Sequence, residues 1–209
     1  MQIKDTFDRK AHWEKIYTTK QPNEVSWHQD VPATSLQLIQ ELNLPKSARI
    51  FDNGAGDSFL VDQLLKLGYK DVTVQDISGA ALNRVKDRLA EESKNVCWVV
   101  DDEAHCQPDG KYDVWHDRAA FHFLIDENEI ESYVQIIERS IKPGGTFIVA
   151  TFSTEGPKKC SGLPVCQYSE TSMEKLLLRS FNKVKCMTQD HTTPFNTTQN
   201  FLFCVFRKR

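Results

Sequence analysis

The sequence lacks a long apolar run, a basic block and closely paired cysteines, and each absence excludes a class of protein. No stretch of about 18 apolar residues is present, which argues against a transmembrane helix. Lys+Arg 26 against Asp+Glu 29 give a formal net charge of −3, and the terminal Arg207-Lys208-Arg209 is too short for a nucleic-acid surface. We therefore expect no membrane or nucleic-acid partner, and a monomer or weak homodimer.

The six cysteines are scattered, and none forms a Cys-x-x-Cys pair. The first five residues are too polar for a signal peptide. A chain without an export signal predicts a cytoplasmic protein with reduced thiols, most of them small buried hydrophobic residues. The spacing of Cys160, Cys166, His122 and His191 matches no zinc pattern, so we predict no metal site.

The N-terminal segment has a helical spacing of aromatic and aliphatic residues. Two amphipathic helices are predicted, over 5–20 and 35–44, joined by an aromatic, polar loop that contains Trp27 and His28. This loop is either a packing strap over the sheet or a lid that closes over a ligand and contacts the substrate.

From residue 45 onward the pattern alternates strands with helices, which is typical of a doubly wound sheet. Seven strands are predicted, over 49–53, 71–78, 96–100, 112–116, 146–152, 181–188 and 199–206. The last two have no helix between them, so we expect them to form an antiparallel hairpin at one edge. The prediction is a single α/β domain (45–209) with a mostly parallel seven-stranded sheet and helices on both faces, preceded by a helical lid segment (1–44).

The first predicted strand runs into Asp52-Asn53-Gly54-Ala55-Gly56-Asp57-Ser58, and a helix follows directly. Such a junction places backbone at the carboxyl edge of a parallel sheet, where α/β proteins bind ligands. Gly54 and Gly56 permit positive φ angles and a close approach to the main chain. The dinucleotide pattern Gly-x-Gly-x-x-Gly fails at Phe59, and Asp57 would repel a pyrophosphate. The alternative is an ordinary tight turn between strand and helix.

Asp52-x-Gly54-x-Gly56-x-Ser58 resembles the first motif of class I S-adenosylmethionine-dependent methyltransferases, with serine at the third glycine position. Pro143-Gly144-Gly145 before a strand is similar to another feature of the class, a structural turn. The resemblance covers roughly residues 45–206 and implies a Rossmann-like fold, with S-adenosylmethionine as cofactor and S-adenosylhomocysteine as product. A zwitterionic ligand without phosphate suits the acidic turn.

Acids at the ends of the second and third strands extend the predicted cofactor site. Asp76 is expected to accept hydrogen bonds from both ribose hydroxyls, since Ser78 is the more natural cap for the next helix. The resemblance implies that Asp102 binds the adenine amino group, although Asp101 is one residue away and both acids suit a solvated turn. The predicted cofactor-binding residues are Trp27, Asp52, Gly54, Ala55, Gly56, Ser58, Asp76, Ile77, Asp102, Glu103 and His116.

The fourth strand ends at His116, and Asp117-Arg118-Ala119-Ala120-Phe121 follows it. This segment resembles the Asp-Arg-Gly-Ala-Phe segment of thiopurine S-methyltransferases and is similar to the Asp-Lys-Gly-Thr segment of some protein lysine methyltransferases. Ala119 replaces the glycine. The resemblance implies that His116, Asp117 and Arg118 line the reaction site; an Asp–Arg pair that only fixes the loop is the alternative.

Two later loops are expected at the ligand edge, where substrate contacts concentrate. Cys160 follows two lysines, which would favour its thiolate if the side chain were exposed. His191 lies in a predicted loop over 189–196 and is a candidate base, although a single histidine is more often structural. The residues predicted to contact the substrate are Trp27, His28, Phe121, Cys160 and His191.

Methyl transfer needs a nucleophile that is aligned behind the sulfonium methyl group and deprotonated. We predict transfer to a small-molecule acceptor, with sulfur as a candidate atom because a thiol of low pKa needs no base. A protein lysine N-methyltransferase is one alternative, and an S-adenosylmethionine-binding protein without catalysis is another. A closed pocket under Trp27 and Cys160 favours the first function, and an open acidic channel favours the lysine enzyme. Phe59 and Asp57 disfavour an NAD-dependent enzyme.

Overall fold

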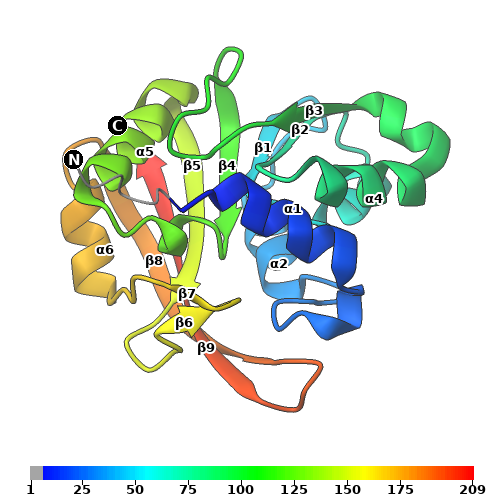
Figure 1. The fold of residues 1–209 in the computed structure, drawn as a ribbon. Coiled ribbons are helices and arrows are strands. Elements are labelled where there is room, and N and C mark those ends of the chain that lie inside the picture. Colours follow the sequence, from blue (N-terminus) through cyan, green and yellow to red (C-terminus); the bar gives the residue numbers. More distant parts are fainter. Residues whose placement is uncertain (1–6) are drawn as a thin grey trace, which may run out of the picture.

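The central sheet has seven strands in the order β3-β2-β1-β4-β5-β9-β8 in the computed structural model, which describes residues 7–209 (Figure 1). The strands are β1 (Arg49–Asn53), β2 (Asp71–Asp76), β3 (Val96–Val100), β4 (Tyr112–Arg118), β5 (Ile141–Phe152), β8 (Phe181–Thr192) and β9 (Thr198–Lys208). Strands β1 to β5 are parallel, whereas β9 is antiparallel to both β5 and β8. The predicted mostly parallel sheet with an antiparallel edge hairpin is confirmed.

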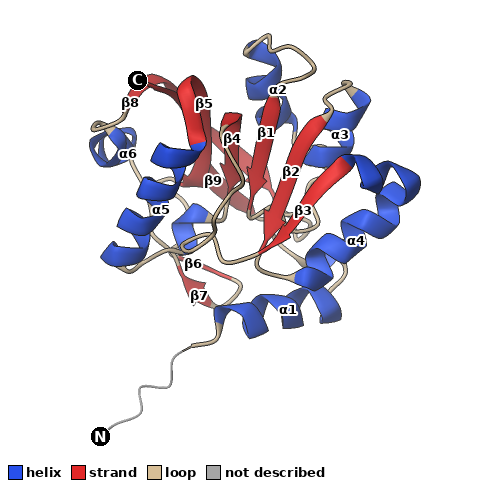
Figure 2. Cartoon of the chain, turned by 90° about the horizontal axis from the view of Figure 1, so that it is seen from above, coloured by secondary structure: helices blue, strands red, loops and turns tan. Residues whose placement is uncertain are grey.

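Helices cover both faces of the sheet: α2 and α3 lie on one side, and α5 and α6 on the other (Figure 2). The α-helices are α1 (Arg9–Thr19), α2 (Ala33–Glu41), α3 (Leu60–Lys66), α4 (Gly79–Leu89), α5 (Glu127–Ser140) and α6 (Glu170–Leu177). Short 3-10 helices are η1 (Pro22–Glu24), η2 (Ala90–Asn95) and η3 (Phe121–Phe123). Residues 1–6, which include the start of the helix predicted over 5–20, lie outside the described residues. None of the helices described in 7–209 is long and apolar enough to cross a bilayer.

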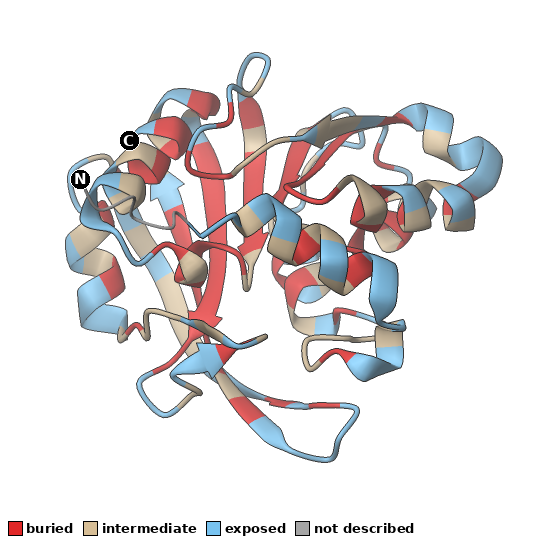
Figure 3. Cartoon of the chain, in the orientation of Figure 1, coloured by how far each residue is buried: buried red, intermediate tan, exposed pale blue. Residues whose placement is uncertain are grey.

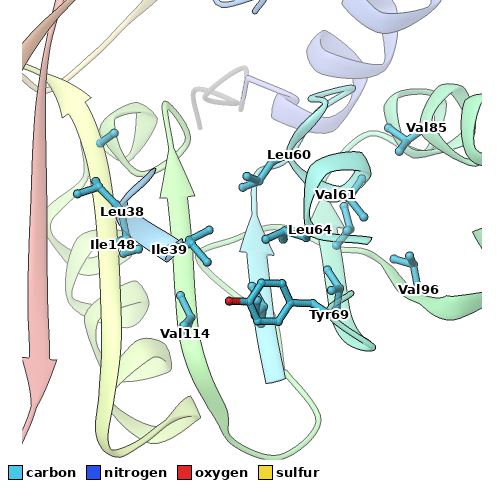
Figure 4. Packing of buried hydrophobic residues seen from close by; sticks show 14 of the residues in the cluster. Leu38, Ile39, Leu60, Val61, Leu64, Tyr69, Val85, Val96, Val114 and Ile148 are labelled. Atoms are coloured by element: carbon cyan, nitrogen blue, oxygen red, sulfur yellow. The ribbon is translucent and has the colours of Figure 1, made fainter. Parts of the chain in front are cut away.

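Consecutive side chains of each strand point to opposite faces of the sheet, so the sheet separates two hydrophobic cores. On one face Val114 and Ile148 pack with residues of α2 and α3 (Figure 4). On the other face Trp115 stacks on Phe51, with 4.0 Å between the ring centroids. The inner strands are buried along most of their length (Figure 3). Neighbouring residues at the end of β4 must therefore face different surroundings.

The predicted turn at Pro143-Gly144-Gly145 lies within β5 rather than before it, and this corrects the prediction. Ile141 already pairs with Tyr112 of β4, and the regular register resumes where Thr146 pairs with Val114. The intervening residues bulge outward, and Gly144 has a φ of 74°. The glycines therefore permit an irregularity in a strand that pairs on both sides of it.

The edge hairpin differs from the prediction in two ways. Strand β8 continues to Thr192, so His191 lies in a strand and not in a loop. Cys186 and Cys204 are directly opposed on β8 and β9, with Cα atoms 4.2 Å apart, and they form a disulfide. The expectation of reduced thiols is wrong for this pair, because the strand register brings together residues that are far apart in sequence. Cys97, Cys106, Cys160 and Cys166 are free.

A second feature absent from the prediction is a small hairpin between β5 and α6. It consists of β6 (Lys159–Cys160) and β7 (Leu163–Pro164), in the segment expected to be a loop. The carbonyl of His122 accepts a hydrogen bond from the Cys166 amide (2.8 Å), which fixes the returning chain against η3. Figure 1 shows β6 and β7 at the end of the sheet where β5 terminates. Cys160 is therefore held in place near the ligand edge.

We expect Gly54→Ala to lower the free energy of unfolding by more than about 1–2 kcal/mol, the usual cost of a left-handed conformation for an L-residue. Gly54 has a φ of +57°, and an added Cβ would lie 2.1 Å from Cβ of Ala120. Gly79→Ala is the control, because an added Cβ there meets nothing within 4 Å. Urea denaturation of both variants measures the difference, and equal stability would contradict the steric argument.

Candidate active site

A cavity lies at the carboxyl ends of β1, β2 and β4, around the glycine turn. It encloses about 990 Å³ of empty space, part of which is open to solvent. The predicted site residues in its wall are Trp27, His28, Asp52, Gly54, Ala55, Ser58, Asp76, Ile77, Glu103, His116, Arg118 and Cys160. The predicted residues outside the wall are Gly56, Asp102, Asp117, Phe121 and His191. The sequence therefore located the cavity but misplaced some of its members.

The glycine turn is ordered by hydrogen bonds to the neighbouring strand β2. The Gly54 amide donates to Oε1 of Gln75 (3.0 Å), and the Gly56 amide donates to Oδ2 of Asp76 (2.7 Å). Asp57, at the end of the turn, accepts a hydrogen bond from Arg84 (3.0 Å). The turn thus presents carboxylates and carbonyl groups to the cavity, and it suits a ligand that donates hydrogen bonds better than a phosphate.

Asp76 is buried at the tip of β2, as predicted for a ribose-binding acid. Its second oxygen, Oδ1, accepts a hydrogen bond from the Ser78 amide (2.8 Å). Burial raises the pKa of Asp76 to about 6, against the two amide hydrogen bonds, which lower it. Each carboxylate oxygen has more than one lone pair, so both can still accept a hydrogen bond from a ligand hydroxyl.

His116 connects Asp52 to helix α2 in a buried hydrogen-bond chain. Its Nδ1 lies 2.7 Å from Oδ1 of Asp52, and its Nε2 lies 2.8 Å from Oγ of Ser35. Both ring nitrogens therefore have partners inside the protein. In this arrangement His116 positions the Asp52 carboxylate in the cavity wall rather than presenting a free nitrogen to a substrate.

Asp117 points to the opposite face of the sheet from His116, because strand side chains alternate. Its carboxylate accepts hydrogen bonds from Tyr133 Oη (2.7 Å), Asn53 Nδ2 (2.8 Å) and the Phe121 amide (3.1 Å). Phe121 is likewise in the core, stacked on Tyr168. Asp117 therefore fixes the following loop, but through the Phe121 amide and its core partners and not through the Asp–Arg pair that sequence analysis gave as the alternative; Phe121 lies outside the cavity wall.

At the end of β3 the structure places Glu103, not Asp102, in the cavity wall. Asp102 lines a separate surface hollow and lies 3.7 Å from Nε of Arg9, while Nη1 of Arg9 lies 3.5 Å from Glu103. Arg9 also contacts Glu129 of α5. Burial, and secondly the Asp102 charge, raise the pKa of Glu103 to about 8. One cation from α1 thus ties three carboxylates together beside the cavity.

Four aromatic side chains close one side of the cavity, and sequence analysis identified only one of them. Trp13 contacts Trp27 and Phe123 edge to face, with ring centroids 5.7 Å and 4.9 Å apart. Tyr17 packs on Trp27 at 6.2 Å, and a Cβ on Gly56 would lie 2.2 Å from the Tyr17 hydroxyl. Trp13 and Tyr17 belong to the predicted lid segment, but neither was predicted as a site residue, because nothing in the sequence shows which side chains of α1 meet the glycine turn.

Cys160 and His191 both have structural partners. A thiolate was expected only if Cys160 were exposed, and that condition is not met: Cys160 is buried, burial raises its pKa to about 11, and its Sγ lies 3.9 Å from Oγ of Ser26. His191 lies behind the loop: its Nε2 is 2.7 Å from the Ser26 carbonyl oxygen and its Nδ1 is 3.4 Å from Gln29. His191 therefore anchors the predicted lid loop to β8 and does not face the cavity.

The far side of the cavity is built from strands β4, β5 and β9. Arg118 ends β4, Phe152 ends β5, and Gln199 and Phe201 stand near the start of β9. Of these, only Arg118 was predicted. Because β9 is antiparallel to β5, the first residues of β9 lie at the carboxyl edge of the sheet. The predicted hairpin therefore already implied that Gln199 and Phe201 lie near the site.

The described residues suit S-adenosylmethionine and offer no metal cluster. The carboxyl groups of Asp52, Asp76 and Glu103 in the cavity wall match a ligand that donates hydrogen bonds from an ammonium, two hydroxyls and an amino group. Within residues 7–209 there is no group of three or more histidine, cysteine or acidic side chains in a metal-binding arrangement.

Comparison with known proteins agrees with this geometry. Residues 50–145 match a family described as "Methyltransferase domain". The N-methyltransferase NodS from Bradyrhizobium japonicum, solved with S-adenosylhomocysteine, superposes with a TM-score of 0.74 over 96% of this chain and 99% of that one, at 16% identity. That likeness concerns the fold. The family match, which covers a little under half of the chain, and the shared fold together support a class I S-adenosylmethionine-dependent methyltransferase.

Curated relatives share only part of their length with this chain. The eEF1A lysine and N-terminal methyltransferase of Bos taurus is 23% identical over 146 residues, which are 66% of this chain and 20% of the relative. Malonyl-[acyl-carrier protein] O-methyltransferase 2 of Ilyobacter polytropus is 25% identical over 107 residues, 51% of this chain and 40% of the relative. The chain thus spans less than half of the length of each of these relatives, and the names of the relatives state different methyl acceptors.

We expect Tyr133→Phe to lower the free energy of unfolding by about 1–3 kcal/mol, the cost of leaving a buried polar group unsatisfied. The Tyr133 hydroxyl donates to Asp117 and accepts from Nε1 of Trp115 (3.1 Å). Tyr69→Phe is the control, since the Tyr69 hydroxyl has no side-chain partner within residues 7–209. Chemical denaturation measures both, and matching losses would argue against an Asp117-centred network.

Proposed function

We propose that this protein transfers the methyl group of S-adenosylmethionine to a small-molecule acceptor. The observation that carries the proposal is the partly enclosed cavity beside the glycine turn, covered by Trp13, Tyr17 and Trp27 from the N-terminal segment. Residues 7–44 then act as the predicted lid. A covered cavity of this kind excludes water from the sulfonium and admits a compact acceptor.

The sheet order divides the proposed roles between two halves of the cavity. We assign Asp52 of β1, Asp76 of β2 and Glu103, in the loop after β3, to the amino acid, ribose and adenine parts of the cofactor. Strands β4, β5 and β9 supply the acceptor half, with Arg118 of β4 in its wall beside Cys160 of the small β6–β7 hairpin. The sulfonium is expected between the halves, near the aromatic ring faces, which favour a cation.

The acceptor atom is expected to need little help with deprotonation. His116 and His191 each have both ring nitrogens hydrogen bonded, and Cys160 is a neutral thiol at physiological pH. His28 lies in the wall, but it packs on Phe59 at 6.1 Å, on the glycine-turn side. A sulfur nucleophile that is already ionised suits such a site, and this supports sulfur as the candidate acceptor atom.

A protein lysine acceptor is the second candidate, and the 23% identity to the Bos taurus lysine and N-terminal methyltransferase favours it. A lysine side chain would have to reach the cofactor past the loop between η1 and α2. That loop is anchored by Gln29 and by the Ser26 carbonyl, both held by His191. The anchoring favours a small acceptor over a peptide.

We expect calorimetric titration to show micromolar binding of S-adenosylmethionine and S-adenosylhomocysteine and none of NAD. The protein should then methylate a member of a panel of small thiols, amines and carboxylates with radiolabelled cofactor, and leave a lysine-containing peptide unmodified. Methylation of the peptide but of no small molecule would favour the protein lysine N-methyltransferase instead. Tight cofactor binding without turnover of any acceptor would indicate a binding protein, and no binding of either sulfur nucleoside would overturn the proposal.

The affinity for S-adenosylhomocysteine should weaken by up to about tenfold per pH unit as the pH falls below 6. The cause is Asp76: its pKa is raised to about 6, and a ribose hydroxyl donates well only to the ionised carboxylate. Asp76→Asn should weaken binding at pH 7 by about 10- to 100-fold, or about 1–3 kcal/mol, and flatten the profile between pH 5 and 7. Asp71→Asn, at the other end of β2, is the control. A wild-type slope that persists in Asp76→Asn would remove the ribose assignment.

A further inference from the structure

The acceptor half of the cavity contains one strong cation, Arg118, and no carboxylate of the described residues lies within ion-pair distance of it. Its Nη1 donates to the Trp27 carbonyl oxygen (3.2 Å), and its guanidinium carbon lies 5.1 Å from the ring centroid of Phe201. Its Nε is buried and has no hydrogen-bond partner in the part of the chain that the structure describes. A guanidinium group has five donor hydrogens, so most of its capacity remains unused.

The other arginines near the cavity are neutralised, and this makes Arg118 distinct. Arg9 lies against three carboxylates, Arg84 pairs with Asp57 at 3.0 Å and Arg88 pairs with Asp62 at 2.8 Å. Among residues 7–209, Arg118 is the one lysine or arginine in the cavity wall. Burial of a cation without a partner is costly unless something else compensates for it, and a ligand anion in the cavity does so.

A second unpaired group lies in the same half of the cavity. Gln199 is 8% exposed, and its Nε2 donates to Oγ of Ser26 (3.2 Å), which fixes the direction of the amide. Its Oε1 is buried in the wall and has no partner among residues 7–209. Phe152 and Phe201 stand nearby, with ring centroids 4.8 Å apart, and provide an apolar surface. The acceptor half of the cavity therefore offers the hydrogen-bond donors of the Arg118 guanidinium, one hydrogen-bond acceptor on Gln199 and an aromatic surface.

We propose that the methyl acceptor carries an anionic group, a carboxylate or its equivalent, which binds the Arg118 guanidinium, on a compact aromatic or apolar body that packs on Phe152 and Phe201. Gln199 accepts a hydrogen bond from a hydroxyl or amino group of the same molecule. This inference rests on the proposed function and names its substrate class. An ammonium-bearing acceptor such as lysine is disfavoured at this position, because two like charges would meet in a poorly solvated site.

The carboxylate of the cofactor itself is the competing partner for Arg118. The sheet order argues against it: β4 lies between the glycine-turn strand β1 and β5, and Phe201, which Arg118 overlies, belongs to β9 beyond β5. The guanidinium thus lies over a residue of the acceptor half, although burial lowers the pKa of Arg118 and the Asp52 carboxylate at the glycine turn is near enough to oppose that effect. Because both anions are chemically alike, the experiment has to measure cofactor binding and acceptor binding separately.

The test uses the full chain saturated with S-adenosylhomocysteine and titrated with benzoate, benzamide and benzylamine. These probes share a ring and differ in charge. We expect benzoate to bind at least about tenfold more tightly than either other probe, as a charge-assisted fork of hydrogen bonds would give. Arg118→Gln should abolish this preference, Arg118→Lys should retain part of it, and Arg179→Gln, which removes an exposed arginine, should retain all of it.

Binding of S-adenosylhomocysteine to each variant supplies the second measurement and reports whether the variant is folded. Unchanged affinity for S-adenosylhomocysteine in Arg118→Gln, together with loss of the benzoate preference, supports the inference. An equal or larger loss of S-adenosylhomocysteine affinity would mean that Arg118 holds the cofactor carboxylate. Equal binding of benzoate and benzamide to the wild-type complex, or tighter binding of benzylamine, also overturns it. Failure of the wild-type protein to bind S-adenosylhomocysteine would instead refute the proposed function.

Discussion

The close contacts of two glycines hold the whole site together. Gly54 leaves no room for a side chain because Ala120, after β4, lies against it, and Gly56 is covered by the hydroxyl of Tyr17 from α1. The turn after β1 is thus the meeting point of the strand that carries Asp52, the loop that follows Arg118 and the N-terminal helix. If one of these parts shifts, the other two lose a packing surface, so cavity shape and lid position are coupled through backbone contacts.

The alternation of side chains along β4 decides which polar residues serve the cavity. His116 and Arg118 share one face, and Asp117 between them faces α5. This separation gives the three adjacent residues different tasks: His116 orients Asp52, Asp117 fixes the following loop through its amides, and Arg118 faces the acceptor half. Three adjacent residues that the sequence suggests are one catalytic group are therefore two structural anchors and one largely buried cation in the cavity wall.

Much of the fold was predictable because local sequence patterns indicate the elements: apolar residues with a period of two indicate a strand, and a capped amphipathic stretch indicates a helix. Asp76 and the glycines were predictable for the same reason, since they are defined by the ends of those elements. Trp13, Tyr17 and Gln199 were missed because their role depends on packing between distant elements. The Cys186–Cys204 disulfide depends on strand register in the same way, and the exchange of Asp102 for Glu103 is a one-residue uncertainty in where a strand ends.

The two halves of the cavity impose opposite electrostatic requirements, and this narrows the chemistry. The cofactor half presents Asp52 and Asp76, whose carboxyl groups suit the ammonium and hydroxyl groups of S-adenosylmethionine, and Glu103, which we assign to the adenine amino group. The acceptor half presents Arg118, which at about 5 Å and an effective dielectric constant near 20 interacts with a unit charge by about 3 kcal/mol. An anionic acceptor is drawn to that half and simultaneously neutralises the sulfonium across the cavity. An ammonium acceptor meets two cations and must also lose a proton, for which His116, bonded at both nitrogens, offers no free site.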